Sequence, residues 1–125
     1  MPSTVESIPS DMASTLIRIS KVGVRTILTP SVSLSYQNIE ELATVFNDCI
    51  RQPKTEVILD CKSIKFLDSS VLELLVRVHK DLKGNGGVLK IIGLNENGRD
   101  IFYATRLINV LNVFKDIHEA IRHNP

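Results

Sequence analysis

The sequence predicts an α/β domain in which helices pack against a mixed β-sheet. Short runs of aliphatic and β-branched residues alternate along the chain with longer segments whose apolar residues recur every three or four positions. The first two apolar runs follow each other without a helix between them, whereas a helical segment separates the later ones. Strands joined by a turn pair antiparallel and strands joined through a helix pair in parallel, so the sheet should be mixed.

Length and composition are those of one ordinary globular domain. The chain has 125 residues, of which 43% are hydrophobic and 23% are charged. Its 15 lysines and arginines nearly balance its 14 aspartates and glutamates, and a net charge of +1 argues against nucleic acid or an anionic membrane as the main partner. No apolar run approaches the length of a membrane span and no secretory signal is visible, so we expect a cytoplasmic protein.

The chain is expected to begin with a tail and a pair of strands. Residues 1–15 are rich in Ser, Thr and Pro and have no hydrophobic period, which predicts a flexible N-terminal tail ahead of a domain at 16–125. Apolar residues at 16–19 and 22–28 predict two strands, with residues 20–21 as the hairpin turn between them.

A helix and a buried strand should follow. Residues 36–51 carry an apolar stripe at three- and four-residue steps, which predicts a helix with Ser35 as its N-cap. Residues 56–60 have a continuous apolar centre, which is typical of a strand covered on both faces. The helical stripe consists of Ile39, Leu42, Ala43, Phe46 and Ile50.

The middle of the chain predicts a longer helix. A short strand-like run at 64–67 leads into a helical pattern that extends from about Asp68 to Lys83. Glu73 and Arg77 are spaced to form an ion pair on the outer face of this helix. Glycines at 84, 86 and 87 follow a helix and open a strand, so they predict a turn rather than a phosphate-binding loop. The buried stripe consists of Val71, Leu74, Leu75, Val78 and Leu82.

The remaining elements are two strands and two helices. Residues 88–92 and 110–114 predict strands, and a helix at 96–106 is expected to start from Asn95 as its N-cap. A short final helix, ending near Arg122, follows a capping arrangement of Asp and Glu at 116–119.

No catalytic, metal or cofactor site is predicted. The two cysteines form no C-x-x-C pair, the three histidines have no metal-ligand spacing, and no serine lies in a nucleophile elbow. We expect the cysteines to be free, buried thiols. The cysteines are Cys49 and Cys61, and the histidines are His79, His118 and His123.

One junction has a possible function beyond folding. Asp68, Ser69 and Ser70 lie between the strand-like run and the helix, and Asp and Ser are the preferred N-cap residues. The same position favours anions, because free N–H groups and the helix macrodipole meet there. Phosphorylation would add about −1.5 to −2 charges beside Asp68 and would repel a docked partner without melting the helix.

These residues carry a family resemblance over about residues 55–122. The motifs are Val-Ile-Leu-Asp at 57–60, Phe-Leu-Asp-Ser-Ser at 66–70, the glycines before Val88, and the segments 114–116 and 119–121. In this combination they resemble a STAS domain of the bacterial anti-sigma factor antagonist kind. The resemblance implies a four- to five-stranded mixed β-sheet with helices packed mainly on one face.

The resemblance also implies a partner switch. The unphosphorylated family member binds an anti-sigma factor that is also a serine kinase, and this binding frees a sigma factor. Phosphorylation of the second serine of Asp-Ser-Ser abolishes binding, and a PP2C-type phosphatase restores it. That serine is Ser70 here, with Ser69 as the second choice. No cofactor is implied, and the chain alone should be a monomer.

The partner surface implied by the resemblance surrounds this serine and includes the loop after the second strand. Val71 stands where many antagonists have glycine, and we expect it to supply an apolar contact. The loop at 30–35 lacks the aspartate of the usual Gly-x-Leu-Asp, a difference that bears on partner identity. The expected contact residues are Asp68, Ser69, Val71, Leu72, Ser33 and Ser35.

A second interpretation remains open. The chain could instead be a non-switching STAS scaffold subunit of a sensory or transport complex. Ser69 and Ser70 would then serve only to start the helix.

Overall fold

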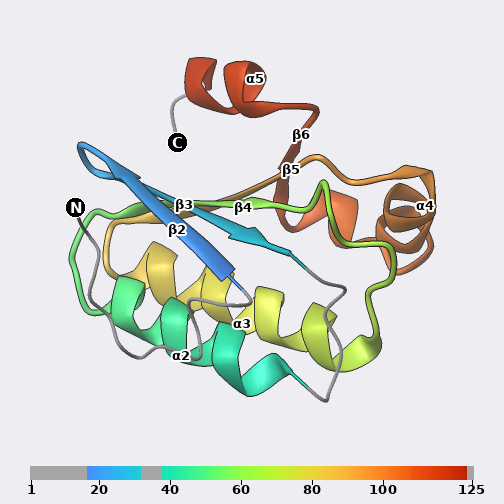
Figure 1. The fold of residues 1–125 in the computed structure, drawn as a ribbon, viewed down its shortest axis with the longest axis horizontal. Coiled ribbons are helices and arrows are strands. Elements are labelled where there is room, and N and C mark those ends of the chain that lie inside the picture. The colour runs from blue at the N-terminus through green and yellow to red at the C-terminus, as the bar shows by residue number, and fades with distance from the viewer. Residues whose placement is uncertain (1–16, 32–37, 124–125) are drawn as a thin grey trace.

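A computed structural model describes residues 17–31 and 38–123, which form a five-stranded sheet with helices on both of its faces (Figure 1). The predicted tail at 1–15 and the predicted loop contacts Ser33 and Ser35 lie outside the described residues. In chain order the elements are β2 (Ile17–Val22), β3 (Arg25–Pro30), α2 (Ile39–Ile50), β4 (Glu56–Asp60), α3 (Ser69–Gly84), β5 (Val88–Ile92), α4 (Glu96–Ala104), the 3₁₀-helix η1 (Leu107–Asn109), β6 (Asn112–Phe114) and α5 (Ile117–Arg122).

The strands lie side by side in the order β2-β3-β4-β5-β6. β2 and β3 pair antiparallel, and every later neighbouring pair is parallel. The sheet is therefore mixed, as the sequence predicts. Because β3, β4, β5 and β6 run in one direction, their C-terminal ends share one edge of the sheet, and the connections to α3, α4 and α5 all start there.

The main core lies between the sheet and the layer formed by α2 and α3 (Figure 1). Val57, Leu59, Leu89 and Ile91 of the two central strands pack in this layer with the apolar faces of both helices. Ile58 and Ile92 alternate with them and pack on the opposite face, in a small cluster that includes Ala120 of α5. The helices thus lie mainly on one face, and both central strands are covered on both sides, as expected for the continuous apolar run of β4.

The hairpin turn lies three residues later than the sequence predicts. β2 continues to Val22, and the turn is formed by Gly23 and Val24 before β3 starts at Arg25. Gly23 has a φ of 64°, a conformation that tight two-residue hairpin loops require and that glycine adopts without steric cost. Five of the six β2 residues are exposed, so this strand has no alternating apolar pattern from which its end can be read.

Three smaller predictions also need correction. The first long helix begins at Ile39 with Asn38 as its N-cap. The run at 64–67 forms no strand but only an isolated bridge at its last residue. The predicted pair of Glu73 with Arg77 is wrong, because Arg77 extends toward the next helical turn and pairs with Asp81 at 3.1 Å.

Candidate functional site

The candidate site is the start of α3, at the carboxyl edge of the sheet. Asp68 is the N-cap residue and has extended backbone angles, with φ −96° and ψ 175°. Its Oδ1 atom accepts a hydrogen bond from the backbone N–H of Val71 at 3.1 Å. The prediction that the helix begins at the Asp-Ser-Ser segment is therefore confirmed, and the local reason is capping of the first turn by the Asp68 side chain, which adds to the bond of 3.1 Å between the Val71 N–H and the Asp68 carbonyl oxygen.

The two serines occupy different environments. Ser69, the first helical residue, is exposed, whereas Ser70 is half-buried. The Ser70 hydroxyl donates a hydrogen bond of 2.7 Å to the same Oδ1 atom of Asp68 that caps the helix. Since a hydroxyl has one proton, this bond leaves the lone pairs of the Ser70 oxygen available to attack an electrophile.

The electrostatics of this helix end suit an added anion. α3 has 16 residues, and its first turn contains no acidic residue after the cap. The partial positive charge at the N-terminus of such a helix stabilises negative charge by about 0.3–1 kcal/mol at an exposed position. A phosphate on Ser69 or Ser70 would lie within this field, although close to the carboxylate of Asp68.

The structure does not fit the expected contact role of Val71. This side chain is 0% exposed and belongs to the main core beneath α3. It lies on the same stripe as Leu74, Leu75 and Val78, so it faces the sheet rather than a partner. Val71 contributes to the site through its backbone N–H, which Asp68 caps.

An apolar groove begins beside Ser69. It has a volume of about 350 Å³ and lies between the outer face of α3 and the segment around η1. Leu72, a predicted partner contact, is one of its half-buried lining residues. The carboxylate of Glu73 stands at the groove and forms no ion pair within the part of the chain that the structure describes. The lining residues are Ser69, Leu72, Glu73, Val76, Thr105 and Leu107.

Several of these residues are absent from the sequence-based prediction. Val76 follows Leu72 by one helical turn, so a second, weaker apolar stripe beside the buried one was visible in the sequence. Thr105 and Leu107 come from a distant segment and carry no such signal. Phe66, two residues before the cap, is 67% exposed and adds a large aromatic surface near the same helix end.

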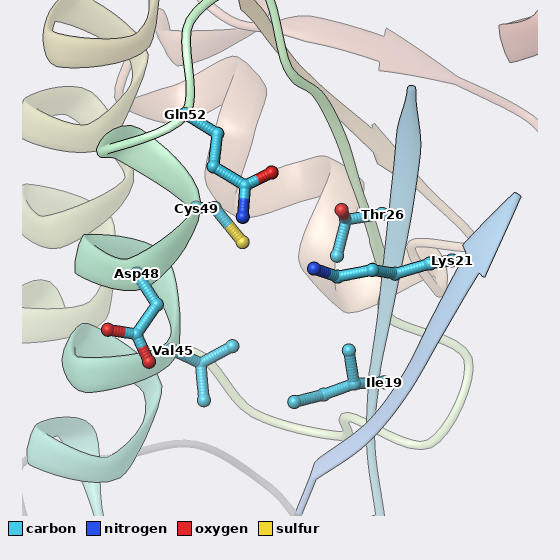
Figure 2. A pocket seen from close by; sticks show the side chains of 7 residues that line it. All are labelled: Ile19, Lys21, Thr26, Val45, Asp48, Cys49 and Gln52. Carbon is cyan, nitrogen blue, oxygen red and sulfur yellow. The ribbon is translucent and has the colours of Figure 1, made fainter. Parts of the chain in front are cut away.

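A second pocket, of about 150 Å³, separates the β2–β3 hairpin from α2 (Figure 2). The Lys21 side chain extends across it from β2, and the Cys49 thiol faces it from α2 (Figure 2). Burial raises the pKa of this thiol more than the nearby Lys21 ammonium lowers it. The thiol is therefore protonated at neutral pH and is a poor nucleophile.

The prediction of free, buried cysteines is confirmed for both residues. Burial raises the pKa of Cys61 to about 12, and the neighbouring charge of Asp60 adds to this effect. None of the described helices is long and apolar enough to cross a membrane.

Known proteins resemble this chain over most of its length. The sequence profile of the STAS domain matches residues 16–120. A curated protein of Thermotoga neapolitana, named by homology as an anti-sigma factor antagonist, is 23% identical over 96 residues, which cover 76% of this chain and 85% of the relative.

Solved structures share the fold. The crystal structure of a Thermotoga maritima protein described in the same terms aligns with a TM-score of 0.78 and 20% identity, covering 84% of this chain and 91% of that one. The Bacillus cell fate determinant SpoIIAA in its phosphorylated form aligns with a TM-score of 0.65 and 18% identity, covering 84% and 96% of the two chains. The profile match spans far more than half of the sequence, and the five-stranded mixed sheet agrees with it. This chain belongs to the STAS domain family.

Proposed function

We propose that this protein is an anti-sigma factor antagonist whose binding to its partner is switched by phosphorylation of Ser70. The observation that carries the proposal is the hydrogen bond of 2.7 Å between the Ser70 hydroxyl and Asp68 at the N-terminus of α3. The Ser70 oxygen lies at the helix end and follows Ser69, which lines the apolar groove that a partner would cover.

The partner of the unphosphorylated protein is an anti-sigma factor that also acts as a serine kinase. It docks over the start of α3 and extends into the apolar groove, where Leu72 and Val76 supply apolar contact. A basic group of the partner pairs with the carboxylate of Glu73 at the groove. Because the anti-sigma factor is then bound to this protein, it releases the sigma factor.

Phosphorylation transfers the γ-phosphoryl group of ATP to Ser70. The serine oxygen bonds to the γ-phosphorus, the bond from that phosphorus to the β,γ-bridging oxygen breaks, and ADP leaves. The hydroxyl proton passes to a base of the kinase. A PP2C-type phosphatase reverses the change by hydrolysis, which returns the serine hydroxyl and releases inorganic phosphate.

The modified serine can no longer donate its hydrogen bond to Asp68, and a group of charge about −1.5 to −2 stands next to that carboxylate. The helix macrodipole offsets part of the repulsion, so the fold persists. The net charge of the whole chain is +1, and one phosphate changes it only to about −0.5 to −1. The effect on binding therefore arises from the local charge at the docking surface.

The comparisons support this proposal in two ways. The curated relative is named as an anti-sigma factor antagonist. The structural neighbours include SpoIIAA, an anti-sigma factor antagonist whose structures are described in unphosphorylated and phosphorylated forms. A phosphorylated neighbour with this fold agrees with a switch that leaves the domain folded.

The test is a binding titration against each serine-kinase anti-sigma factor encoded in the source genome. We expect one of them to bind wild type and Ser70→Ala alike, and to bind Ser70→Asp at least tenfold more weakly. Ser69→Asp is the matched control, since it adds the same charge one residue away. Loss of binding in Ser69→Asp alone would move the switch to Ser69, and unchanged binding in both aspartate variants would favour a constitutive scaffold.

A further inference from the structure

A third pocket lies where α4, η1 and the end of β6 meet. Figure 1 draws these elements in orange and red. Its volume is about 290 Å³, and it shares no lining residue with the groove beside Ser69. Its apolar lining includes Leu94, Ile108 and Val113, which are buried or half-buried and belong to or contact the main core. The floor of this pocket is therefore held by the fold itself.

Two cations line the same pocket. The Arg99 guanidinium belongs to α4, and the Lys115 ammonium follows the last residue of β6. Neither side chain forms an ion pair with any described residue. Of the acidic residues near Lys115 in sequence, Asp116 caps α5, and Glu119 accepts the backbone N–H of Lys115 at 2.7 Å.

The exposed aromatic ring of Tyr103 also lines the pocket. Tyr103 follows Arg99 by four residues, so both side chains project from one face of α4. The Tyr103 side chain is 64% exposed, which leaves its ring face and its hydroxyl accessible at the pocket. An aromatic surface beside two cations can bind both the apolar body and the acid group of one small molecule.

The pocket lies at the carboxyl edge of the parallel strands. Leu94 and Lys115 lie just beyond the C-terminal ends of the parallel strands β5 and β6. At about 290 Å³ the pocket stands at the small end of the range for ligand sites.

We propose that this pocket binds a small organic anion, a carboxylate or phosphate attached to an apolar or aromatic body. Arg99 and Lys115 pair with the acid group, and the guanidinium matches the geometry of either acid. The body rests on the apolar floor and against the Tyr103 ring. This site does not involve Ser70 and stands independently of the proposed switch.

The test is a titration of the full chain with phenylacetate and phenyl phosphate, followed by amide chemical-shift mapping. Phenylacetamide, a neutral ligand of the same shape, and inorganic phosphate, an acid group without a body, are the matched control ligands. We expect shifts confined to α4, η1 and the region around β6 for at least one organic anion. Both control ligands should bind at least tenfold more weakly.

Variants of the two cations complete the test. Arg99→Gln and Lys115→Gln should each weaken binding about tenfold, and Lys80→Gln, which removes an exposed cation from α3, should leave it unchanged. The same spectra show whether each variant is folded. Equal binding of phenylacetamide or inorganic phosphate, unchanged affinity in both pocket variants, or no localised shifts with either organic anion would overturn the proposal.

Discussion

Oγ of Ser70 lies 2.7 Å from Oδ1 of Asp68, and this carboxylate oxygen also accepts a hydrogen bond from the backbone N–H of Val71 in the first turn of α3. One atom therefore caps the helix and orients the proposed phosphoacceptor. Folding and the proposed switch involve the same side chain, so the two roles of Asp68 must be separated by experiment. A stability measurement on Asp68 variants does this, because it does not depend on any partner.

We expect Asp68→Ala to lower the free energy of unfolding by about 1 kcal/mol, within a range of about 0.5–2 kcal/mol for the loss of an N-cap. The cause is the loss of the acceptor for the Val71 N–H. Urea denaturation measures this change. Asp68→Asn is the matched control, because its amide oxygen is still an acceptor, and an equal loss in both variants would contradict the capping role.

We expect Val71→Ala to destabilise the domain by about 2 kcal/mol, since it removes two buried methyl equivalents worth about 0.8 kcal/mol each and leaves a small cavity. The side chain is 0% exposed, so the lost contacts lower the free energy of unfolding in full. Val76→Ala in the half-buried groove lining is the control and should cost less. A Val71→Ala variant as stable as wild type would show that this side chain is not packed in the core.

Lys90 is a buried cation that holds the C-terminal helix. Its Nζ atom donates to the carbonyl oxygens of Ala120 at 2.6 Å and His123 at 2.5 Å, and it pairs with Glu56 at 3.2 Å. Lys90→Met breaks these bonds and leaves the Glu56 carboxylate with Arg25 as its remaining ion-pair partner. We expect a loss of about 3–5 kcal/mol, as for a buried pair that loses one member.

Hydrogen exchange tests the local part of this prediction, because the amides of α5 should lose protection in Lys90→Met more than those of α3. A second substitution, Glu56→Gln, removes the carboxylate that has lost one of its two cationic partners and should recover part of the lost stability. Wild-type protection of α5 in the single variant would refute the role assigned to Lys90.

Cys61 should make stability depend on alkaline pH. Its thiol keeps its proton in the folded protein up to a pKa of about 12, mainly because it is buried, whereas the unfolded chain releases that proton near pH 9. Between these values the unfolded state binds fewer protons, so the free energy of unfolding falls as pH rises, by up to about 1.4 kcal/mol per pH unit. Cys61→Ala should show a shallower decline than wild type, and parallel curves would contradict this assignment.

Much of the fold could be predicted because its signals are local. β4 and β5 have the bounds that their apolar runs predict, and three helices start at the capping residues named from the sequence. Side-chain acceptors at these positions need only the next turn of the chain, so no distant contact is involved. The three caps are Asp68, Asn95 and Asp116.

Two features that the sequence did not predict depend on distant contacts. Nothing near Lys90 in the sequence indicates its hydrogen-bond partners, because the carbonyl oxygens that it binds lie about 30 residues further along. The groove beside Ser69 likewise depends on Thr105 and Leu107, which only the fold brings to α3. Val71 is a different case, since the sequence already placed it on the buried stripe of the helix. Its position in the core is confirmed, and the partner contact expected of it is not compatible with that position.

The central claim is that Ser70 is the switched residue, and site-resolved mass spectrometry after incubation with the cognate kinase and ATP tests it most directly. We predict one phosphate per chain, located on Ser70, and a modified protein that no longer binds the kinase but regains binding after phosphatase treatment. Ser70→Ala should accept no phosphate while Ser69→Ala is modified as wild type. A stoichiometric phosphate on another residue, or a Ser70-phosphorylated chain that binds the kinase as tightly as before, would contradict the account.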